Sequence, residues 1–270
     1  MPYICPLCAQ PLSQIERTYK CKNRHSFDIA KEGYVNLLPV HKKSSIDPGD
    51  NKEMMRSRRE FLDKGFYQYL SDRINQLILE FKLNVTNLLD IGCGEGYYTN
   101  RLVESLSSQS STNAYGLDIS KTAVKLAAKR YKDVNFCVAS AFDTPFADNS
   151  FDGVLKVYAP SALTELKRII KQDGYLITVS PGPEHHWFLK TVIYSEPKLN
   201  SNEDDLLEGF ELVHSERLQS LMSLNEATDV TNFLSMTPYA WKLSEFQKSQ
   251  LCANNLKCEL DFKIQIHKRC

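Results

Sequence analysis

The chain has 270 residues, of which 42% are apolar and 24% are charged, and its 33 basic and 33 acidic residues leave no net charge. This length accommodates one large domain with or without a small appendage, and the composition is ordinary for a soluble globular protein. The charge balance does not indicate a DNA-binding protein, and no stretch approaches 18 uninterrupted apolar residues, so we expect no membrane span. The opening "MPYICPLC" lacks the pattern of a signal peptide, so we expect a cytoplasmic location.

The first 25 residues carry a pattern of metal-binding side chains. Cys5 and Cys8 form a C-x2-C pair, and Cys21 and His25 follow after twelve and three intervening residues. Zinc prefers four tetrahedral sulfur or nitrogen ligands, and a segment of about forty residues needs such a metal because it buries little core. A redox pair would start a helix after a strand, and a DNA-reading C2H2 finger would have a histidine as its third ligand. The pattern therefore predicts a closed structural zinc site.

From about residue 70 the chain alternates between helical and strand-like patterns. Such alternation predicts a doubly wound α/β fold with a mainly parallel sheet. Helices are expected at 69–81, at 97–106, at 120–131 with Ser120 as the N-cap, and at 161–172 closed by Gly174. Strands are expected at 86–92, 114–120, 134–140, 151–159 and 175–181, with a closing strand at 258–268.

A glycine-rich loop, "DIGCGEG" at 90–96, follows the first of these strands. Gly92, Gly94 and Gly96 are spaced G-x-G-x-G, which differs from the G-x-G-x-x-G of dinucleotide binders. Glycine at these positions lets the backbone approach a ligand closely. Asp118 ends the next strand, 22 residues after Gly96, where its carboxylate can accept hydrogen bonds from ribose hydroxyls. The pattern predicts a ligand at the carboxyl ends of the strands.

This combination resembles the class I methyltransferases that bind S-adenosylmethionine. "LLDIGCGEGYYT" is similar to their first motif, "YGLDIS" to their acidic second motif, and "ASAFDTPFADNSFDGVLKVYA" to their third and fourth. The resemblance implies S-adenosylmethionine as the cofactor, with Asp90 and the glycine loop beside it. A Rossmann-type oxidoreductase is the alternative fold assignment.

Further motifs narrow the resemblance to the bacterial 23S ribosomal RNA guanine-N1 methyltransferases of the RlmA family. They are "FDIAKEGYVNLLPV" (27–40), the stretch 47–67, "PGPEHH" (181–186) and "MTPYAW" (236–241). The resemblance covers essentially the whole chain. It implies a zinc module at 1–40, a connecting segment at 41–68 and a methyltransferase domain at 69–270.

The resemblance also implies roles for individual residues. Cys5, Cys8, Cys21 and His25 match the zinc ligands of the family, and Glu95 and Gly96 match its cofactor loop. Tyr67 and His185 match two further positions that contact the cofactor. Without the resemblance, Tyr67 reads as a packing tyrosine and His185 as a solvent-exposed loop histidine.

The implied reaction is attack of guanine N1 on the sulfonium methyl group. N1 carries a proton at neutral pH, so a base is expected to remove it. The slot that holds an N-P-P-Y-type tetrad in amino-group methylases reads "VYAP" (157–160) here. Tyr158 either lines the base pocket or packs. No residue is assigned as the base, and Asp143 and His186 are the candidates.

The implied RNA substrate gives the zinc module two alternative roles. It grips phosphates through Lys20, Lys22 and Arg24, or it only stabilises the fold. The oligomeric state is not predicted, and a homodimer is one alternative for a protein that binds a large RNA hairpin. Two other functions are alternatives. "TPFADNSFD" is also found in methyltransferases of quinone-like or lipid substrates, and a zinc-bearing RNA-binding protein would lack catalysis altogether.

Overall fold

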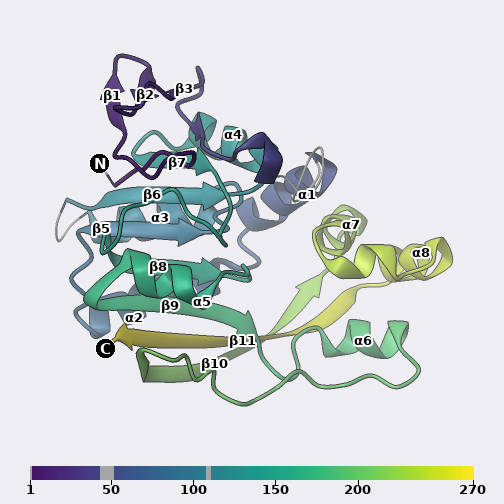
Figure 1. Ribbon diagram of the computed structural model, residues 1–270. Helices are drawn as coiled ribbons and strands as arrows, with labels where there is room; N and C mark the ends of the chain where they lie inside the picture. Colours follow the sequence, from purple (N-terminus) through teal and green to yellow (C-terminus); the bar gives the residue numbers. More distant parts are fainter. Residues whose placement is uncertain (1, 43–51, 108–110) are drawn as a thin grey trace.

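The computed structural model describes residues 2–42, 52–107 and 111–270. Residues 43–51, which belong to the expected connecting segment and to the stretch 47–67, lie outside the described ranges. The main sheet of the described residues has eight strands in the order β10-β11-β9-β8-β5-β6-β7-β4 (Figure 1). All pairs from β9 to β4 are parallel, whereas β11 is antiparallel to β9 and to β10. The predicted doubly wound, mainly parallel α/β fold is confirmed.

The central strands and helices match the sequence pattern closely. The strands are β5 (Asn87–Ile91), β6 (Asn113–Asp118), β7 (Val134–Val138), β8 (Phe151–Val157) and β9 (Ile170–Pro181). The helices between them are α2 (Gln68–Glu80), α3 (Tyr97–Leu106), α4 (Lys121–Arg130) and α5 (Leu163–Ile169). Ser120 caps α4 as predicted, because its side chain accepts a hydrogen bond from the N–H of Ala123.

One predicted boundary is wrong. The helix expected to close at Gly174 ends at Ile169, and β9 begins at the next residue. Ile170 pairs with Phe151 in the sheet, so its burial against β8 overrides the helical propensity of the sequence that follows. A Cβ at Gly174 would lie 2.8 Å from Cγ2 of Ile170. This glycine therefore serves a close approach of the chain to itself and not a helix cap.

Two long antiparallel strands extend the sheet beyond the classical alternation. β11 (Leu256–Arg269) contains the predicted closing strand, and β10 (Phe210–Leu224), which the sequence pattern did not predict, pairs along its length. The remaining helices are α1 (Lys52–Asp63), α6 (Trp187–Ile193), α7 (Ala227–Ser235) and α8 (Glu245–Ala253), with 3-10 turns η1 (Val40–Lys42) and η2 (Pro238–Trp241). In the described part of the chain, no helix combines the length and apolar character needed to cross a bilayer.

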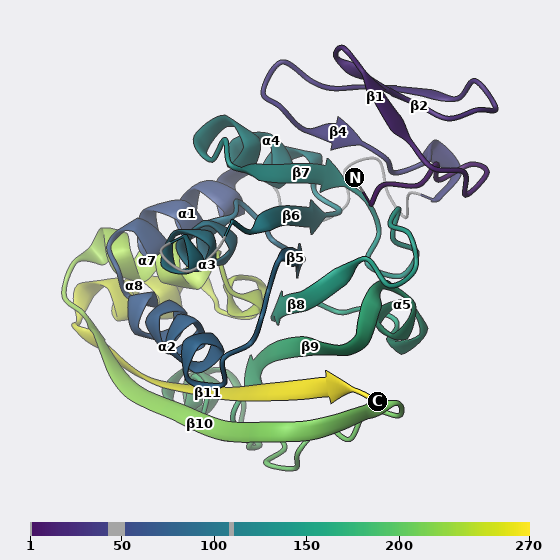
Figure 2. The same cartoon turned by 90° about the vertical axis from the view of Figure 1, so that its left-hand side faces the viewer.

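The two faces of the sheet are covered differently. Helices α1 to α4 lie along one face, and their apolar residues join one hydrophobic cluster with those of the strands (Figure 2). The other face is covered by α5 together with the N-terminal residues, which form a small sheet of β1 (Ser13–Ile15), β2 (Thr18–Lys20) and β3 (Ser26–Asp28) (Figure 2). The N-terminal residues thus occupy surface that helices cover on the opposite side.

Tyr3 anchors these N-terminal residues. Its ring is 2% exposed, stacks on Phe146 at a centroid distance of 5.2 Å and meets Tyr115 edge-on at 5.6 Å. Further along the chain, β4 (Val35–Asn36) adds a parallel strand to the edge of the main sheet beside β7. Because burial of aromatic rings dominates packing energy, the N-terminal residues are an integral part of the hydrophobic core.

Candidate metal centre and active site

Two tight turns bring the four predicted metal ligands together. The N–H of Ala9 donates to the carbonyl of Cys5 at 2.8 Å, and the N–H of Arg24 donates to the carbonyl of Cys21 at 3.0 Å. Ala9 and Arg24 both adopt a positive φ, which closes each turn. The ligand atoms of Cys5, Cys8, Cys21 and His25 all lie within 4.8 Å of one another.

The distances within this cluster fit a tetrahedral zinc ion. Cys8 Sγ lies 3.7 Å from Cys21 Sγ, and His25 Nδ1 lies 3.4 Å from Cys5 Sγ and 3.5 Å from Cys21 Sγ. Zinc–sulfur bonds of about 2.3 Å at tetrahedral angles place two sulfur ligands about 3.8 Å apart. Three thiols and an imidazole are also the donor types that zinc selects. All eight cysteines are free of disulfides, so none of these thiols is otherwise engaged.

The glycine loop between β5 and α3 is held against the neighbouring strands. Gly92, Gly94 and Gly96 all have positive φ, which favours glycine. A Cβ at Gly92 would lie 2.4 Å from the Cβ of Ala159, just beyond β8. A Cβ at Gly94 would meet nothing within 4 Å. Gly92 therefore permits a close approach of two chain segments, whereas Gly94 permits a turn that faces open space.

The carboxyl groups of two aspartates hold the glycine loop in place. Asp118, at the end of β6, accepts hydrogen bonds from the N–H groups of Gly94 at 2.9 Å and Ser120 at 2.8 Å. Asp90 is buried at the end of β5 and accepts a hydrogen bond from Thr99 Oγ1 at 2.5 Å. Burial raises the pKa of Asp90 to about 7, and the nearby Asp118 contributes in the same direction. Both carboxylates thus hold backbone or helix groups of the loop and lie on its cavity side.

Glu95 connects the loop to α1. Its side chain is 2% exposed and forms an ion pair with Arg59. Burial raises the pKa of Glu95 despite the opposing effect of Arg59. Glu95 Oε1 and Arg59 Nη2 are both buried without a hydrogen-bond partner among the described residues. Such buried polar atoms are costly unless a ligand or an ordered water satisfies them.

A cavity of about 550 Å³ opens above the carboxyl ends of β5, β6 and β8. This volume lies within the range of small-molecule and cofactor sites. Of the eight predicted cofactor residues, seven line the cavity: Tyr67, Asp90, Gly92, Gly94, Glu95, Asp118 and His185. Gly96 does not, because a Cβ there would face the rings of Phe136 and Tyr131. The cavity also takes in residues from α1 and from the "MTPYAW" stretch: Arg58, Leu62, Met236, Thr237, Pro238 and Tyr239.

Two tyrosine–histidine pairs form one wall of this cavity. Tyr67 Oη lies 3.1 Å from His186 Nε2, and Tyr158 Oη lies 3.3 Å from His185 Nε2. Both histidines are buried, so the expectation of a solvent-exposed loop histidine at 185 is wrong. Burial lowers the pKa of His185 to about 4 and the pKa of His186 well below its usual value. Both imidazoles are therefore neutral at pH 7.

Asp261 of β11 holds the loop that carries these histidines. Its carboxylate accepts hydrogen bonds from the N–H of Glu184 at 2.9 Å and from Arg217 Nη2 at 2.6 Å, and its own N–H donates to His185 Nδ1 at 3.2 Å. Sequence reasoning missed this residue. The available signal was an acidic side chain in the apolar strand pattern "CELDFKI", where a buried charge requires partners.

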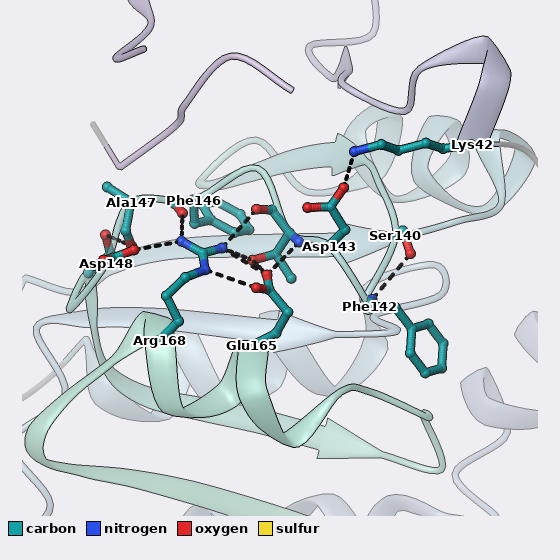
Figure 3. Close-up of polar contacts among 11 residues, drawn as sticks. Lys42, Ser140, Phe142, Asp143, Phe146, Ala147, Asp148, Glu165 and Arg168 are labelled. Carbon is teal, nitrogen blue, oxygen red and sulfur yellow. Dashed lines mark hydrogen bonds and ion pairs between the residues drawn. The ribbon is translucent and has the colours of Figure 1, made fainter. Parts of the chain in front are cut away.

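The loop at 140–148 forms the opposite wall and is fixed by α5. Arg168 donates to the carbonyl of Phe146 at 2.6 Å and to Glu165 at 2.8 Å, and Glu165 accepts from the N–H of Thr144 at 2.7 Å. Figure 3 shows Arg168 and Glu165 reaching from the helix to this loop, while Phe142 points away from them. Ser140, Ala141 and Phe142 line the cavity.

Asp143, one of the two candidates for the general base, lies outside the cavity lining. Its carboxylate forms an ion pair with Lys42, and it is not among the residues that line the cavity (Figure 3). The other candidate, His186, lines the cavity next to His185 at a ring-centroid distance of 3.8 Å. The expectation that Asp143 serves as the base is therefore not supported by its position.

Two family models match this chain. Residues 3–46 match the model described as "RlmA, N-terminal", a zinc ribbon, and residues 83–231 match the model described as "Methyltransferase domain". Together with the doubly wound sheet, the glycine loop and the cysteine–histidine cluster, these matches define a class I S-adenosylmethionine-dependent methyltransferase with a structural zinc module.

Full-length relatives specify the family. A 23S rRNA (guanine(748)-N(1))-methyltransferase from Streptomyces fradiae is 32% identical over 88% of this chain and 85% of that protein. YxjB from Bacillus subtilis (strain 168), named as a candidate 23S rRNA (guanine-N(1)-)-methyltransferase, is 32% identical over 92% of this chain and 89% of that protein. The chain belongs to this family of 23S rRNA (guanine-N1)-methyltransferases. A demethylmenaquinone methyltransferase from Thermotoga maritima is 31% identical over only 46% of this chain.

Proposed function

We propose that this protein transfers a methyl group from S-adenosylmethionine to N1 of a guanine in a hairpin loop of 23S ribosomal RNA, in the cytoplasm. The proposal rests on one combination: the chain holds both a cysteine–histidine cluster and a cavity of cofactor size. Its similarity to 23S rRNA guanine-N1 methyltransferases extends over the segments that form the cluster and the cavity. Similarity to the quinone methyltransferase is limited to less than half of the chain. The RNA substrate is therefore favoured over a quinone or lipid substrate.

The cofactor's place in the cavity follows from the residues around it. Asp118 is proposed to accept hydrogen bonds from the ribose hydroxyls, because it ends β6 and its side chain lines the cavity at the carboxyl ends of the strands. Gly92 and Gly94 are proposed to bring the backbone close to the cofactor, whereas Gly96, outside the cavity lining, allows the turn into α3. The remaining contacts are proposed for Tyr67, Asp90, Glu95 and His185.

The methionine portion of the cofactor is proposed to lie at the end of the cavity next to α1, where Glu95 is part of the lining. Glu95 Oε1 is buried there without a hydrogen-bond partner among the described residues, and an ammonium group would satisfy it. When bound, the sulfonium supplies an electrophilic methyl group. The chain supplies alignment and excludes water.

The guanine must be presented as an unpaired base. N1 lies on the pairing edge, so a paired guanine cannot reach a methyl donor at the base of a cavity. Aromatic side chains that line the cavity, among them Tyr239 and Phe142, are suited to stacking with an extruded base. The N1 proton must leave before or during transfer.

We propose a division of labour along the predicted boundaries, in which residues 1–40 bind zinc and RNA and residues 69–270 bind the cofactor and perform the chemistry. Cys5, Cys8, Cys21 and His25 are the proposed zinc ligands. Lys20 at the end of β2 and Lys22 and Arg24 on the turn that follows are exposed, and they are proposed to contact phosphates. A zinc ion would stiffen the turns that present these charges.

Labelled methyl transfer tests the acceptor class. The purified protein is incubated with tritiated S-adenosylmethionine and, separately, with 23S ribosomal RNA from a strain lacking this modification, with 16S ribosomal RNA and with a demethylated quinone. We expect incorporation into 23S ribosomal RNA alone. Incorporation into the quinone, with none into RNA, would contradict the proposal.

The RNA grip has its own test. Lys20→Ala, Lys22→Ala and Arg24→Ala combined are expected to weaken RNA binding and to lower the slope of log affinity against log salt by about 2, at roughly 0.7 per single-strand phosphate contact. Zinc content and affinity for S-adenosylhomocysteine should stay unchanged. An unaltered salt slope would leave the zinc module as a folding element without RNA contact.

A further inference from the structure

Tyr158 differs from its neighbours in the cavity wall because of its backbone. It directly follows β8 and has a φ of 55°, a left-handed conformation that is unfavourable for a residue other than glycine. Its N–H donates to the carbonyl of Val179 at 3.0 Å, which holds the conformation in place. Strained residues of this kind cluster at ligand-binding positions, where the surrounding structure over-determines them.

The position of Tyr158 in the sheet places it near the reactive end of the cofactor. Asp118, the proposed ribose partner, ends β6, whereas Tyr158 follows β8, and β5 lies between these two strands. Ala159, the next residue, approaches Gly92 so closely that a Cβ there would lie 2.4 Å away. Tyr158 therefore lies beside the glycine loop, on the side of β5 opposite the ribose.

The hydrogen bonds around His185 define which way the Tyr158 hydroxyl donates. The N–H of Asp261 donates to His185 Nδ1 at 3.2 Å, so in the neutral ring the proton is on Nε2. Nε2 lies 3.3 Å from Tyr158 Oη and must donate to it. The Tyr158 oxygen is thus an acceptor in this pair, and its own O–H remains for another partner.

The protonation states support this assignment. Burial lowers the pKa of His185 to about 4, so the ring does not take a second proton at pH 7. Burial raises the pKa of Tyr158 well above its usual value, and the nearby Tyr67, Tyr98, Tyr69 and Asp261 act in the same direction. The phenol therefore keeps its proton. Its ring is 42% exposed and lines the cavity, so the free O–H is available to a ligand there.

We propose that the Tyr158 hydroxyl donates a hydrogen bond to O6 of the target guanine and stabilises the negative charge that O6 gains as N1 loses its proton. This inference rests on the proposed function. N1 and the carbonyl C6–O6 are adjacent, so loss of the N1 proton spreads charge onto O6. A preorganised donor at a site of developing charge is among the strongest contributions to catalysis.

The step balances without another reagent. The N1 lone pair forms the bond to the methyl carbon, the bond from that carbon to sulfur breaks, and its electron pair stays on the now neutral sulfur. The N1 proton is lost to bulk solvent in an equilibrium that precedes methyl transfer, so no water is needed at the reacting atoms. Tyr158 stays protonated throughout, and His185 is a positioning residue that fixes the direction of the phenol O–H.

Tyr158→Phe tests the proposal, because it keeps the ring and removes the donor. We expect a loss of about 100-fold in the rate of methyl transfer at saturating substrates, the order reported for deletion of one such donor. The midpoint of the pH–rate profile should shift up by about one pH unit, because the deprotonated guanine loses the hydrogen bond that stabilises its negative charge. Affinity for S-adenosylhomocysteine should match the wild type, and the melting temperature should fall by only a few degrees, because His185 Nε2–H loses its acceptor. Tyr69→Phe is the matched control, since Tyr69 also contacts Phe262 but lies outside the cavity lining.

A second substrate identifies the atom that Tyr158 contacts. In RNA with 6-thioguanosine at the target position, sulfur replaces O6 and accepts hydrogen bonds weakly. The loss caused by Tyr158→Phe should shrink there to a few-fold. An equal loss on both RNAs with an unshifted pH profile, or a variant within about threefold of wild type, would overturn the proposal. If the wild type forms no 1-methylguanosine, the proposed function itself fails, and this inference fails with it.

Discussion

The metal cluster and the cavity differ in how the chain assembles them. Four ligands from residues 5 to 25 form the cluster, and two local turns set its geometry. The cavity draws residues from position 58 to position 239 and from elements on both sides of the sheet switch point. A local site can be recognised from spacing alone, whereas a site built by the tertiary fold is recognised only where its residues lie in a motif.

The two regions also depend on each other. Tyr3, Cys5 and Cys21 belong to the hydrophobic cluster that includes Leu89 and Ile91 of β5, the strand that leads into the glycine loop. The zinc module therefore packs against the back of the strand that carries the cofactor loop. We expect loss of the metal ligands to weaken ligand binding in the cavity, and we expect substitutions in the cavity to leave zinc binding unchanged.

The largest expected effect comes from removing a metal ligand. Cys8→Ser should abolish zinc binding, destabilise the protein by roughly 5 kcal/mol or more and weaken cofactor binding as a consequence. Zinc content by elemental analysis and thermal unfolding provide the measurement. Cys270→Ser changes an exposed cysteine outside the cluster and serves as the control. Full zinc occupancy in Cys8→Ser would contradict the assigned ligand set.

The reverse disturbance is Gly92→Ala. Gly92 has a positive φ, and the added Cβ would lie 2.4 Å from that of Ala159. We therefore expect the affinity for S-adenosylhomocysteine to fall roughly 100-fold, a loss of about 3 kcal/mol in binding free energy. Gly94→Ala adds the same methyl group to open space and should cost only about 1 kcal/mol from its backbone conformation. Calorimetry measures both. Zinc content should be normal in each, and equal losses would show that the close approach is not the cause.

Arg168→Ala tests the wall formed by the loop at 140–148. Without Arg168, Glu165 loses its ion-pair partner and the carbonyl of Phe146 loses its donor, so we expect a loss of about 2–3 kcal/mol in unfolding free energy. Chemical denaturation provides the value. Lys167→Ala removes an ion pair to a Glu208 side chain that is 89% exposed, and should change stability by less than about 0.5 kcal/mol. A similar small loss for Arg168→Ala would mean that the loop is held by other contacts.

The smallest effect concerns pH. Below pH 6.5 the unfolded chain protonates at His185, while the folded chain does so only near pH 4, so stability falls as the pH drops through this window. His185→Gln should remove up to about 2 kcal/mol of the loss between pH 6.5 and 5. Denaturant midpoints at both pH values, compared between wild type and variant, measure it. Parallel pH dependences would show that His185 titrates normally.

Much of the fold was predictable because its signals are local. The glycine loop, the strand before it and the Ser120 cap follow from short-range pattern and turn chemistry. The end of α5 could not be predicted in this way, because it is set by the pairing of Ile170 with Phe151, which is a tertiary contact. Strand β10 was not predicted, since its sequence is largely polar and it forms a strand by pairing with β11 along its length.

The site shows the same division. Seven of the eight cofactor residues predicted from motifs line the cavity. Asp261 and Arg168 were missed because each acts on a loop outside its own strand or helix, and the ion pair of Asp143 joins it to Lys42, 101 residues earlier in the chain. Charged side chains in an apolar pattern indicate buried partners, but the sequence does not say which partners they are.

Nucleoside mass spectrometry of 23S ribosomal RNA tests the central claim most directly. RNA from a strain lacking the modification is incubated with the protein and S-adenosylmethionine, digested to nucleosides and compared with an untreated sample. We expect new 1-methylguanosine, and about 100-fold less of it from Gly92→Ala at a cofactor concentration well below the wild-type dissociation constant. A methyl group on another guanine atom or on another base would contradict the proposed attack by N1.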